Sequence, residues 1–345
     1  MTAAHLQAGT LGALRLANRI VLAPMSRMQA DEDGLPTQAM ADYYAGYARS
    51  GVGLVITEAV YTDAAHSRAY FRQPGIADAR QARAWARIAG AVHAAGRPVL
   101  MQLQHAGRLA EPGLHACALG PTEARAMGLA WQTQRPYAEA PVRAAGASDI
   151  EALVRGFADA ARRARAAGFD GVELHGARGY LLDGFLSESA LGHLEARLRV
   201  PLAVLRAVRE AMPDGLLSWN LSLYKMDDYR YQPPGGRAEI EAIARALVAA
   251  GADVLHVTTR RALRAEPWGE TLARTVREAV PDCALIANGG LHSGEDCDAA
   301  LAHGGAQAVS LARALLANPD WFARLREGRA LRAYAPGMEA APLSC

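Results

Sequence analysis

Short apolar stretches alternate with longer, alanine-rich amphipathic stretches along almost the whole chain. This alternation is typical of βα units built around a parallel sheet. Apolar stretches predict eight strands, at 19–25, 53–59, 98–104, 171–175, 216–222, 254–258, 284–288 and 308–312. Amphipathic stretches predict eight helices, at 37–50, 78–95, 149–167, 195–211, 238–250, 270–279, 293–303 and 319–327.

Residues typical of helix ends stand at the boundaries of several predicted helices. Gly96, Gly168 and Gly251 follow helices at the place where a C-terminal glycine belongs, and Ser148 with Glu151 has the pattern of a capping box. Eight strands alternating with eight helices predict the α/β class. We expect a single (β/α)8 TIM barrel over residues 1–345, with a C-terminal tail at about 330–345.

The segment 105–147, after the third predicted strand, has no clear hydrophobic period and is rich in proline and glycine. Loops that follow the strands of a barrel lie at its catalytic mouth. This long excursion is therefore predicted to form a lid or a wall of the substrate site.

Composition narrows the class of protein. The chain has 345 residues, 51% of them apolar and 21% charged, and no Ser/Gly/Pro-rich linker divides it, which favours one large domain. The formal net charge of +2 gives no reason to expect a nucleic acid or an anionic membrane as partner. No signal-like segment begins the chain and no run of about eighteen apolar residues occurs in it, so we expect a soluble, cytoplasmic protein.

The four cysteines are Cys117, Cys283, Cys297 and Cys345. They are too scattered for a zinc or iron–sulfur site and too few for a disulfide framework. Reduced structural thiols and the absence of a metal site are therefore expected.

Small residues and an arginine follow the last two predicted strands. The sequence Ala-Asn-Gly289-Gly290 follows strand seven, and Leu-Ala312-Arg313 follows strand eight. In barrels this is the usual place for a phosphate, because glycines let backbone N–H groups approach an anion and arginine adds a bidentate charge. Taken alone, the glycines are also compatible with simple turns of the chain.

Two further strand ends carry specific motifs. Residues 18–27 read NRIVLAPMSR, and residues 175–182 read HGARGYLL after the run AGFDGVE. Their order and separation resemble the Old Yellow Enzyme family of FMN-dependent oxidoreductases. The resemblance extends from about Leu11 to Trp321, and it weakens in the excursion, in the loop after strand four and in the tail.

The resemblance implies non-covalent FMN as cofactor, with NADPH or NADH as reductant. It places the FMN phosphate at the two motifs after strands seven and eight, and the isoalloxazine ring over the end of strand one. It implies that Ser26 contacts the O4 and N5 edge and that Gln102 reads the pyrimidine end. The cofactor-binding residues are then Ala23, Pro24, Met25, Ser26, Ala59, Gln102, His175, Asn220, Gly289, Gly290, Ala312 and Arg313.

The resemblance also implies the reduction of an activated C=C bond. His175 and the residue at 178 would hold the electron-withdrawing oxygen of the substrate, and Tyr180 would protonate the α-carbon. His175, Arg178 and Tyr180 are therefore the predicted catalytic residues.

Arg178 departs from the family, which has a second neutral donor there. A guanidinium suits an anionic enone or enoate. Alternatively, Arg178 points to solvent or pairs with Asp183 or Glu188; both alternatives stay open on the sequence. Residues 186–193 are shorter than their counterpart, so the loop after strand four is expected to be remodelled.

Asn220 stands where relatives have an arginine beside flavin N1. Loss of that cation disfavours anionic reduced flavin, so a specialised dehydrogenase or isomerase of the same fold is an alternative function. A non-redox phosphate-binding lyase or aldolase is disfavoured because Lys225 is the only lysine in the chain. A flavin-binding protein without catalysis is disfavoured by His175 and Tyr180. The tail lacks the arginine that some relatives insert into a neighbour's site, so a monomer or a homo-oligomer with unshared sites is expected.

Overall fold

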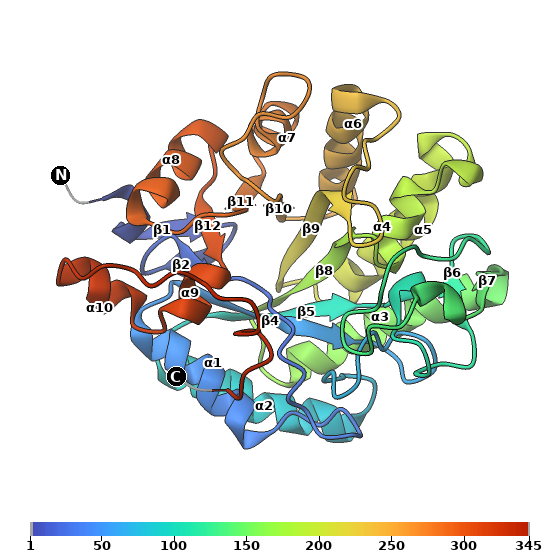
Figure 1. Cartoon of the computed structure of the whole chain (residues 1–345), viewed down its shortest axis with the longest axis horizontal. Coiled ribbons are helices and arrows are strands. Elements are labelled where there is room, and N and C mark those ends of the chain that lie inside the picture. Colours follow the sequence, from blue (N-terminus) through green and yellow to red (C-terminus); the bar gives the residue numbers. More distant parts are fainter. Residues whose placement is uncertain (1–2, 344–345) are drawn as a thin grey trace.

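A computed structural model describes residues 3–343; Met1, Thr2, Ser344 and Cys345 lie outside the described part. Eight parallel strands form a closed barrel, and helices surround it (Figure 1). The (β/α)8 fold is thus confirmed. In barrel order the strands are β3 (Ile20–Leu22), β4 (Leu54–Tyr61), β5 (Val99–Gln104), β8 (Gly171–Arg178), β9 (Leu216–Lys225), β10 (Val254–Thr258), β11 (Ala284–Asn288) and β12 (Ala308–Leu311).

Each predicted helix is present with small changes at its ends. These helices are α1 (Gln38–Ser50), α2 (Ala79–Ala94), α3 (Ala147–Ala166), α5 (Leu194–Ala211), α6 (Gly236–Ala249), α7 (Leu272–Ala279), α8 (Gly294–Gly304) and α10 (Trp321–Arg326). The sequence did not predict α4 (Leu181–Ser187) or α9 (Arg313–Ala317). Both are two turns or shorter, which is too short for a 3.6-residue period to be recognised.

The predicted capping box at the start of α3 is wrong. α3 begins two residues earlier than expected, and the Asp149 carboxylate accepts a hydrogen bond of 2.9 Å from the N–H of Gly146. The Ser148 and Glu151 pattern therefore lies inside the helix and caps nothing. The three C-terminal glycines were predicted correctly: Gly96, Gly168 and Gly251 have φ angles of 72°, 89° and 111°, a backbone region that glycine favours.

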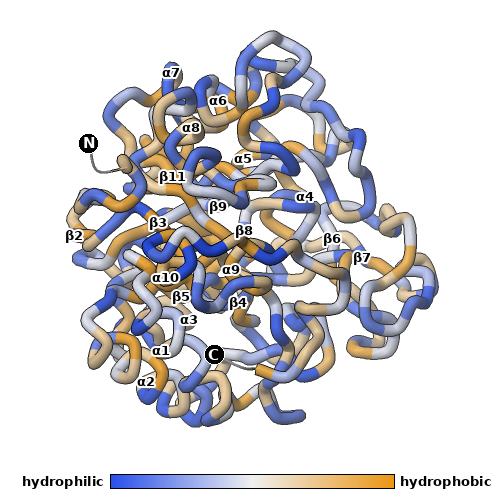
Figure 2. The backbone as a smooth tube through the Cα atoms, turned by 60° about the vertical axis from the view of Figure 1, so that its left-hand side comes forward, coloured by the Kyte–Doolittle hydropathy of each residue, from blue (hydrophilic) through white to orange (hydrophobic). Residues whose placement is uncertain are grey.

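The interior of the barrel has an apolar lower layer. The hairpin of β1 (Gly9–Leu11) and β2 (Leu14–Leu16), which the sequence did not predict, brings Leu11 and Leu16 into this layer. Its other members come from the first halves of the barrel strands: Val21, Leu54, Ile56, Leu100, Leu216, Val254, Ile286 and Ala308. Figure 2 shows these central strands as mainly hydrophobic. Burial of this layer closes the end of the barrel opposite the catalytic mouth.

The excursion after β5 contains the short parallel strands β6 (Ala118–Gly120) and β7 (Val142–Ala144). Its apolar side chains form a separate cluster with Tyr70, from the loop after β4, and Tyr180, from the end of β8. This cluster lies at the mouth of the barrel, where a substrate wall was expected.

Residues 3–343 can be described for membrane-spanning helices, for the state of the cysteines and for metal-binding groups. Every helix in this range is too short or too polar to cross a membrane. The described cysteines Cys117, Cys283 and Cys297 are free thiols. Within the same residues, no three His, Cys, Asp or Glu side chains are grouped so that they could hold a metal ion.

Candidate active site

A cavity of about 240 Å³, which we call the mouth cavity, lies at the carboxyl ends of the barrel strands. Twelve of the predicted site residues line it: Ala23, Pro24, Met25, Ser26, Ala59, Gln102, His175, Arg178, Tyr180, Asn220, Ala312 and Arg313. The remaining two, Gly289 and Gly290, line an adjoining groove of about 1070 Å³, which we call the arginine groove. Arg178, Asn288, Ala312 and Arg313 line both, so the two spaces are continuous.

The loop that carries Ser26 is held by a buried carboxylate. Glu58 accepts hydrogen bonds of 2.9 Å from the N–H groups of Arg27 and Met28, and one of 3.2 Å from the Tyr44 hydroxyl. Burial raises the pKa of Glu58 to about 6, although these hydrogen bonds oppose the shift. The chain leaves the sheet after β3 because Pro24 has no N–H to continue the ladder, and Glu58 orders the segment that follows.

A second buried carboxylate lies under the mouth cavity. Glu173 accepts from Gln102 Nε2 at 2.9 Å, from Asn220 Nδ2 at 3.2 Å and from Ser218 Oγ at 2.9 Å, and His256 Nδ1 lies 2.8 Å away. Burial raises the pKa of Glu173, but His256 and the hydrogen bonds outweigh it, and the net shift is downward. An ionised carboxylate only accepts, so the amide nitrogens of Gln102 and Asn220 must face it.

This orientation leaves the Gln102 amide oxygen for a ligand, whereas the Asn220 oxygen accepts from Thr258 Oγ1 at 3.0 Å. Lys225 does not serve as a cation at the Asn220 edge, because it is buried in an ion pair with Asp183. His256 is the basic side chain beside Asn220, at 3.1 Å, and the sequence reasoning missed it. A single histidine in an apolar strand gives no motif.

His175 and Tyr180 face each other in the mouth cavity, with ring centroids 4.8 Å apart. Burial, together with the charge of Arg178, lowers the pKa of His175 to about 3, so the ring is neutral at physiological pH. His175 Nδ1 is buried and has no hydrogen-bond partner among the described residues. A buried polar atom of this kind costs free energy unless a ligand satisfies it.

Tyr180 has a partner that the sequence did not indicate. Its hydroxyl forms a short hydrogen bond with the hydroxyl of Tyr70, which comes from the loop after β4. Burial raises the pKa of Tyr180, so it keeps its proton at neutral pH. Tyr70 lies far from any recognisable motif, and only folding places it here.

Arg178 occupies a left-handed conformation at the end of β8, with φ of 63°. Asp183 is paired with Lys225, and Glu188 lies 3.7 Å from Arg108. The expected alternative that Arg178 pairs with one of these acids is therefore wrong. Its guanidinium instead lies over the Tyr224 ring, 5.7 Å from the centroid, and faces both the mouth cavity and the arginine groove.

Gly289 and Gly290 form a tight turn after β11, with φ angles of 144° and 65°. A Cβ atom at Gly289 would lie 2.5 Å from Thr259 Oγ1, so only glycine fits this close approach. The C-terminal tail also reaches the site: Tyr334 and Glu339 line the mouth cavity, and Arg27 donates to the carbonyl of Glu339 at 2.9 Å. The C-terminal tail of the chain therefore forms part of the wall of the site in the same chain.

The residues at the mouth match a flat heteroaromatic ring with an anionic tail. The Gln102 amide oxygen and the unpartnered His175 Nδ1 suit a polar ring edge and its ligand, and the glycine turn with Arg313 suits a phosphate. Residues 9–332 match the model of the NADH:flavin oxidoreductase / NADH oxidase family. The chain belongs to this family. It is a flavin oxidoreductase of the Old Yellow Enzyme type, and FMN is its cofactor.

Known proteins are similar to this one over most of its length. An NADH oxidase of Thermoanaerobacter brockii is 33% identical over 338 residues, which cover 93% of this chain and 50% of the relative. A 12-oxophytodienoate reductase 7 of Oryza sativa subsp. japonica is 32% identical over 93% of this chain and 87% of its own length. The structure of an Old Yellow Enzyme homologue from Zymomonas mobilis superimposes with a TM-score of 0.87 at 28% identity, covering 98% of this chain and 96% of that one.

The chain spans about half the length of the first curated relatives that it matches, 50% to 58%. The activities of those longer proteins therefore do not transfer to it as a whole.

Proposed function

We propose that this protein reduces an activated C=C bond of a small molecule, with NADH or NADPH as the source of electrons. The observation that carries the proposal is the pair of His175 and Tyr180, two uncharged hydrogen-bond donors that face one cavity above the predicted flavin site. FMN, when bound, supplies the hydride. The protein side chains then have to bind the activating oxygen and supply a proton.

His175 and Arg178 are proposed to bind the activating oxygen. Negative charge develops on that oxygen as hydride reaches the β-carbon, so a donor placed there stabilises the transition state more than the ground state. The low pKa of His175 keeps it a neutral donor, while Arg178 brings a full positive charge. This pair favours substrates whose activating group is a carboxylate over those with a plain ketone.

Tyr180 is proposed to give the proton to the α-carbon. Its raised pKa keeps the hydroxyl protonated until the carbanion character of the substrate develops. The hydrogen bond between the Tyr180 and Tyr70 hydroxyls holds the Tyr180 hydroxyl at the cavity.

A specialised dehydrogenase or isomerase of the same fold is the second candidate function. It is favoured by the surroundings of Asn220, where a neutral amide stands in place of the family arginine and hydrogen-bonds the buried Glu173 carboxylate. Negative charge at this edge opposes the formation of anionic reduced FMN. The choice between the two functions depends on whether a reduced nicotinamide can reduce the bound flavin.

Anaerobic titration of the purified protein with NADH and NADPH, followed by an alkene, tests the choice. A yellow protein that is bleached by a nicotinamide and recoloured by an enone or enoate supports the proposed reductase. Yellow protein that neither nicotinamide bleaches supports the second function. Protein that binds no FMN contradicts both.

Replacement of Asn220 by arginine is expected to raise the two-electron midpoint potential of the bound FMN by roughly 30 to 65 mV. This range follows from a charge-assisted contact of ~1.5 to 3 kcal/mol with reduced flavin. Reduction by nicotinamide should become faster. The measurement is a dye-linked redox titration, and Asn220→Gln is the neutral control. An unchanged potential in Asn220→Arg would mean that Glu173 neutralises the new cation or that His256 already serves this edge.

A further inference from the structure

The arginine groove is lined by an excess of cationic side chains. Among the described residues that line it, six are arginines and one, Glu266, is a carboxylate. The arginines come from the ends of β8 and β12 and from the loops after β9 and β10, so four separate parts of the chain contribute to one charged surface. They are Arg178, Arg230, Arg260, Arg261, Arg264 and Arg313.

None of these six side chains takes part in the ion pairs or side-chain hydrogen bonds found within residues 3–343. Of the six, Arg264 is the arginine whose charge acts on the one carboxylate among the described residues of the groove: it lowers the pKa of Glu266, while the larger effect of burial raises that pKa. Arginines elsewhere are commonly paired: Arg197 lies 2.8 Å from Glu239 and Arg237 lies 2.6 Å from Glu278. The groove therefore gathers uncompensated positive charge in a concave space.

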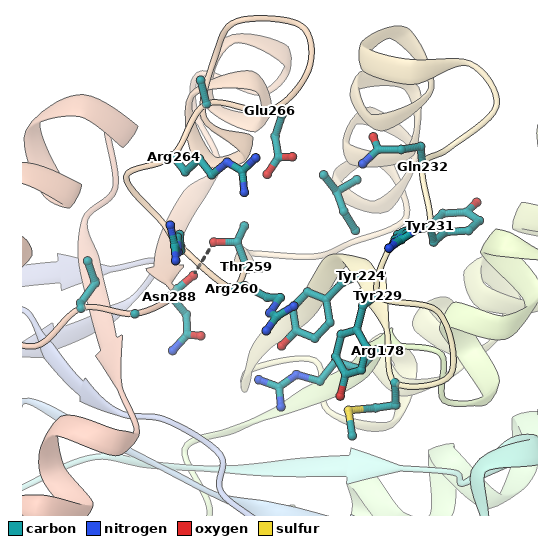
Figure 3. Close-up of a pocket in the computed structure, with 18 of the residues that line it drawn as sticks. Arg178, Tyr224, Tyr229, Tyr231, Gln232, Thr259, Arg260, Arg264, Glu266 and Asn288 are labelled. Atoms are coloured by element: carbon teal, nitrogen blue, oxygen red, sulfur yellow. Dashed lines mark hydrogen bonds between the residues drawn. The ribbon is translucent and has the colours of Figure 1, made fainter. Parts of the chain in front are cut away.

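Four of the groove side chains form a continuous stack (Figure 3). The Arg178 guanidinium lies over Tyr224 at 5.7 Å, Tyr224 stacks on Tyr229 with centroids 6.2 Å apart and planes 16° from parallel, and Arg260 lies over Tyr229 at 5.0 Å. A cation over a ring face is held in place without using its N–H groups. The stack therefore presents two oriented guanidinium groups whose donors remain free for anions.

One anion is already accounted for, because the FMN phosphate is assigned to Gly289, Gly290 and Arg313. Arg178 borders both the mouth cavity and the groove. A molecule whose reacting bond lies between His175 and Tyr180 would leave the cavity past Arg178 and enter the groove along the Tyr224–Tyr229 stack. A small neutral enone would leave this whole surface unused.

We propose that the substrate carries a second anionic group, a carboxylate or a phosphate, on a tail that binds in the arginine groove at Arg260. The position of the reacting C=C bond depends on the proposed function above. The tail site is inferred independently, from the arginine–tyrosine stack and from the arginines that have no acidic partner among the described residues. Arg230 and Arg264, on the flanking loops, add positive potential at the outer part of the groove. The substrate class is thus a dianionic unsaturated compound and not a simple enone.

Binding to the oxidised, FMN-loaded protein tests this without turnover. The probes are hex-2-enedioate, its monoester with a free acid at the conjugated end, and the corresponding terminal phosphate, each followed by the change in flavin absorbance. Arg260→Met should weaken the dicarboxylate or the phosphate roughly tenfold or more and the monoester less than about twofold. The probe that loses more affinity identifies the tail group. Arg155→Met, on the exposed face of α3, is the control with the same change in net charge.

Several results would overturn the proposal. Equal weakening of all three probes, or no change in any, would show that Arg260 does not read the tail. Loss of FMN from Arg260→Met and also from Arg230→Met would assign these arginines to the cofactor phosphate. Weaker binding of NADPH but not NADH, with unchanged probes, would assign the groove to the reductant. If the probes discriminate as expected but no alkene is reduced, the proposed reaction fails while the anionic tail site stands.

Discussion

Tyr180→Phe is expected to slow the reoxidation of reduced enzyme by an alkene by roughly 100-fold to 10,000-fold, the range for a lost general acid. The substitution removes only the hydroxyl, which lies in the mouth cavity against Tyr70. FMN content and the rate of flavin reduction by nicotinamide should stay unchanged, because neither needs this proton. Stopped-flow measurement of the two half-reactions separates these effects.

Tyr70→Phe is the matched control for this experiment. It removes the partner hydroxyl but leaves the Tyr180 hydroxyl in the cavity. The proton donor is therefore still present, but it is less well positioned. We expect a slowing of about tenfold at most, since one neutral hydrogen bond contributes ~0.5 to 1.5 kcal/mol. An unaltered alkene rate in Tyr180→Phe, or an equal loss in both variants, would show that the proton reaches the substrate by another route.

Arg178→His is expected to reverse the preference of the enzyme between an enoate and a neutral enone of the same shape. In the natural protein the enoate should bind more tightly, because the guanidinium at the mouth has no carboxylate partner among the described residues. A charge-assisted hydrogen bond contributes ~1.5 to 3 kcal/mol, so each affinity ratio should change roughly tenfold to a hundredfold. Histidine tolerates the left-handed backbone of this position, with φ of 63°, better than most residues.

Competition between the two ligands, read from flavin absorbance, gives the ratio directly. Arg178→Lys separates charge from shape, because it keeps the cation but loses the planar donor pair and the stack on Tyr224. It should retain a preference for the anion, though a smaller one. Similar affinities for enoate and enone in all three proteins would mean that Arg178 does not contact the activating group.

Several elements could be predicted because their information is local. The strands at 254–258 and 284–288 were placed to the residue, since short apolar runs there are bounded by turns. Other elements lacked a local signal. The hairpin of β1 and β2 has strands of three residues, and α4 and α9 are too short for a period. Their positions depend on what they cover, the open end of the barrel and the mouth.

The candidate site also has a part that could be predicted from the sequence and a part that could not. The fourteen predicted residues were named from the family resemblance, and they lie within or just after the predicted strands, whose carboxyl ends meet at one face of a barrel. All of them line the mouth cavity or the arginine groove. Tyr70 and His256 were missed because their importance lies in partners 110 and 83 residues away, Tyr180 and Glu173.

By itself the sequence determined the barrel, the family and the strand ends that carry the chemistry, because hydrophobic period and motif spacing are written along the chain. Only the tertiary structure decided which partners the charged groups take. On the sequence, Arg178 could bind substrate, point to solvent or pair with Asp183 or Glu188; in the structure Asp183 pairs with Lys225, and Arg178 lies over Tyr224. The strength of a charge–charge interaction depends on the distance between the groups and on their burial. Both are set only when separate strands and loops pack together.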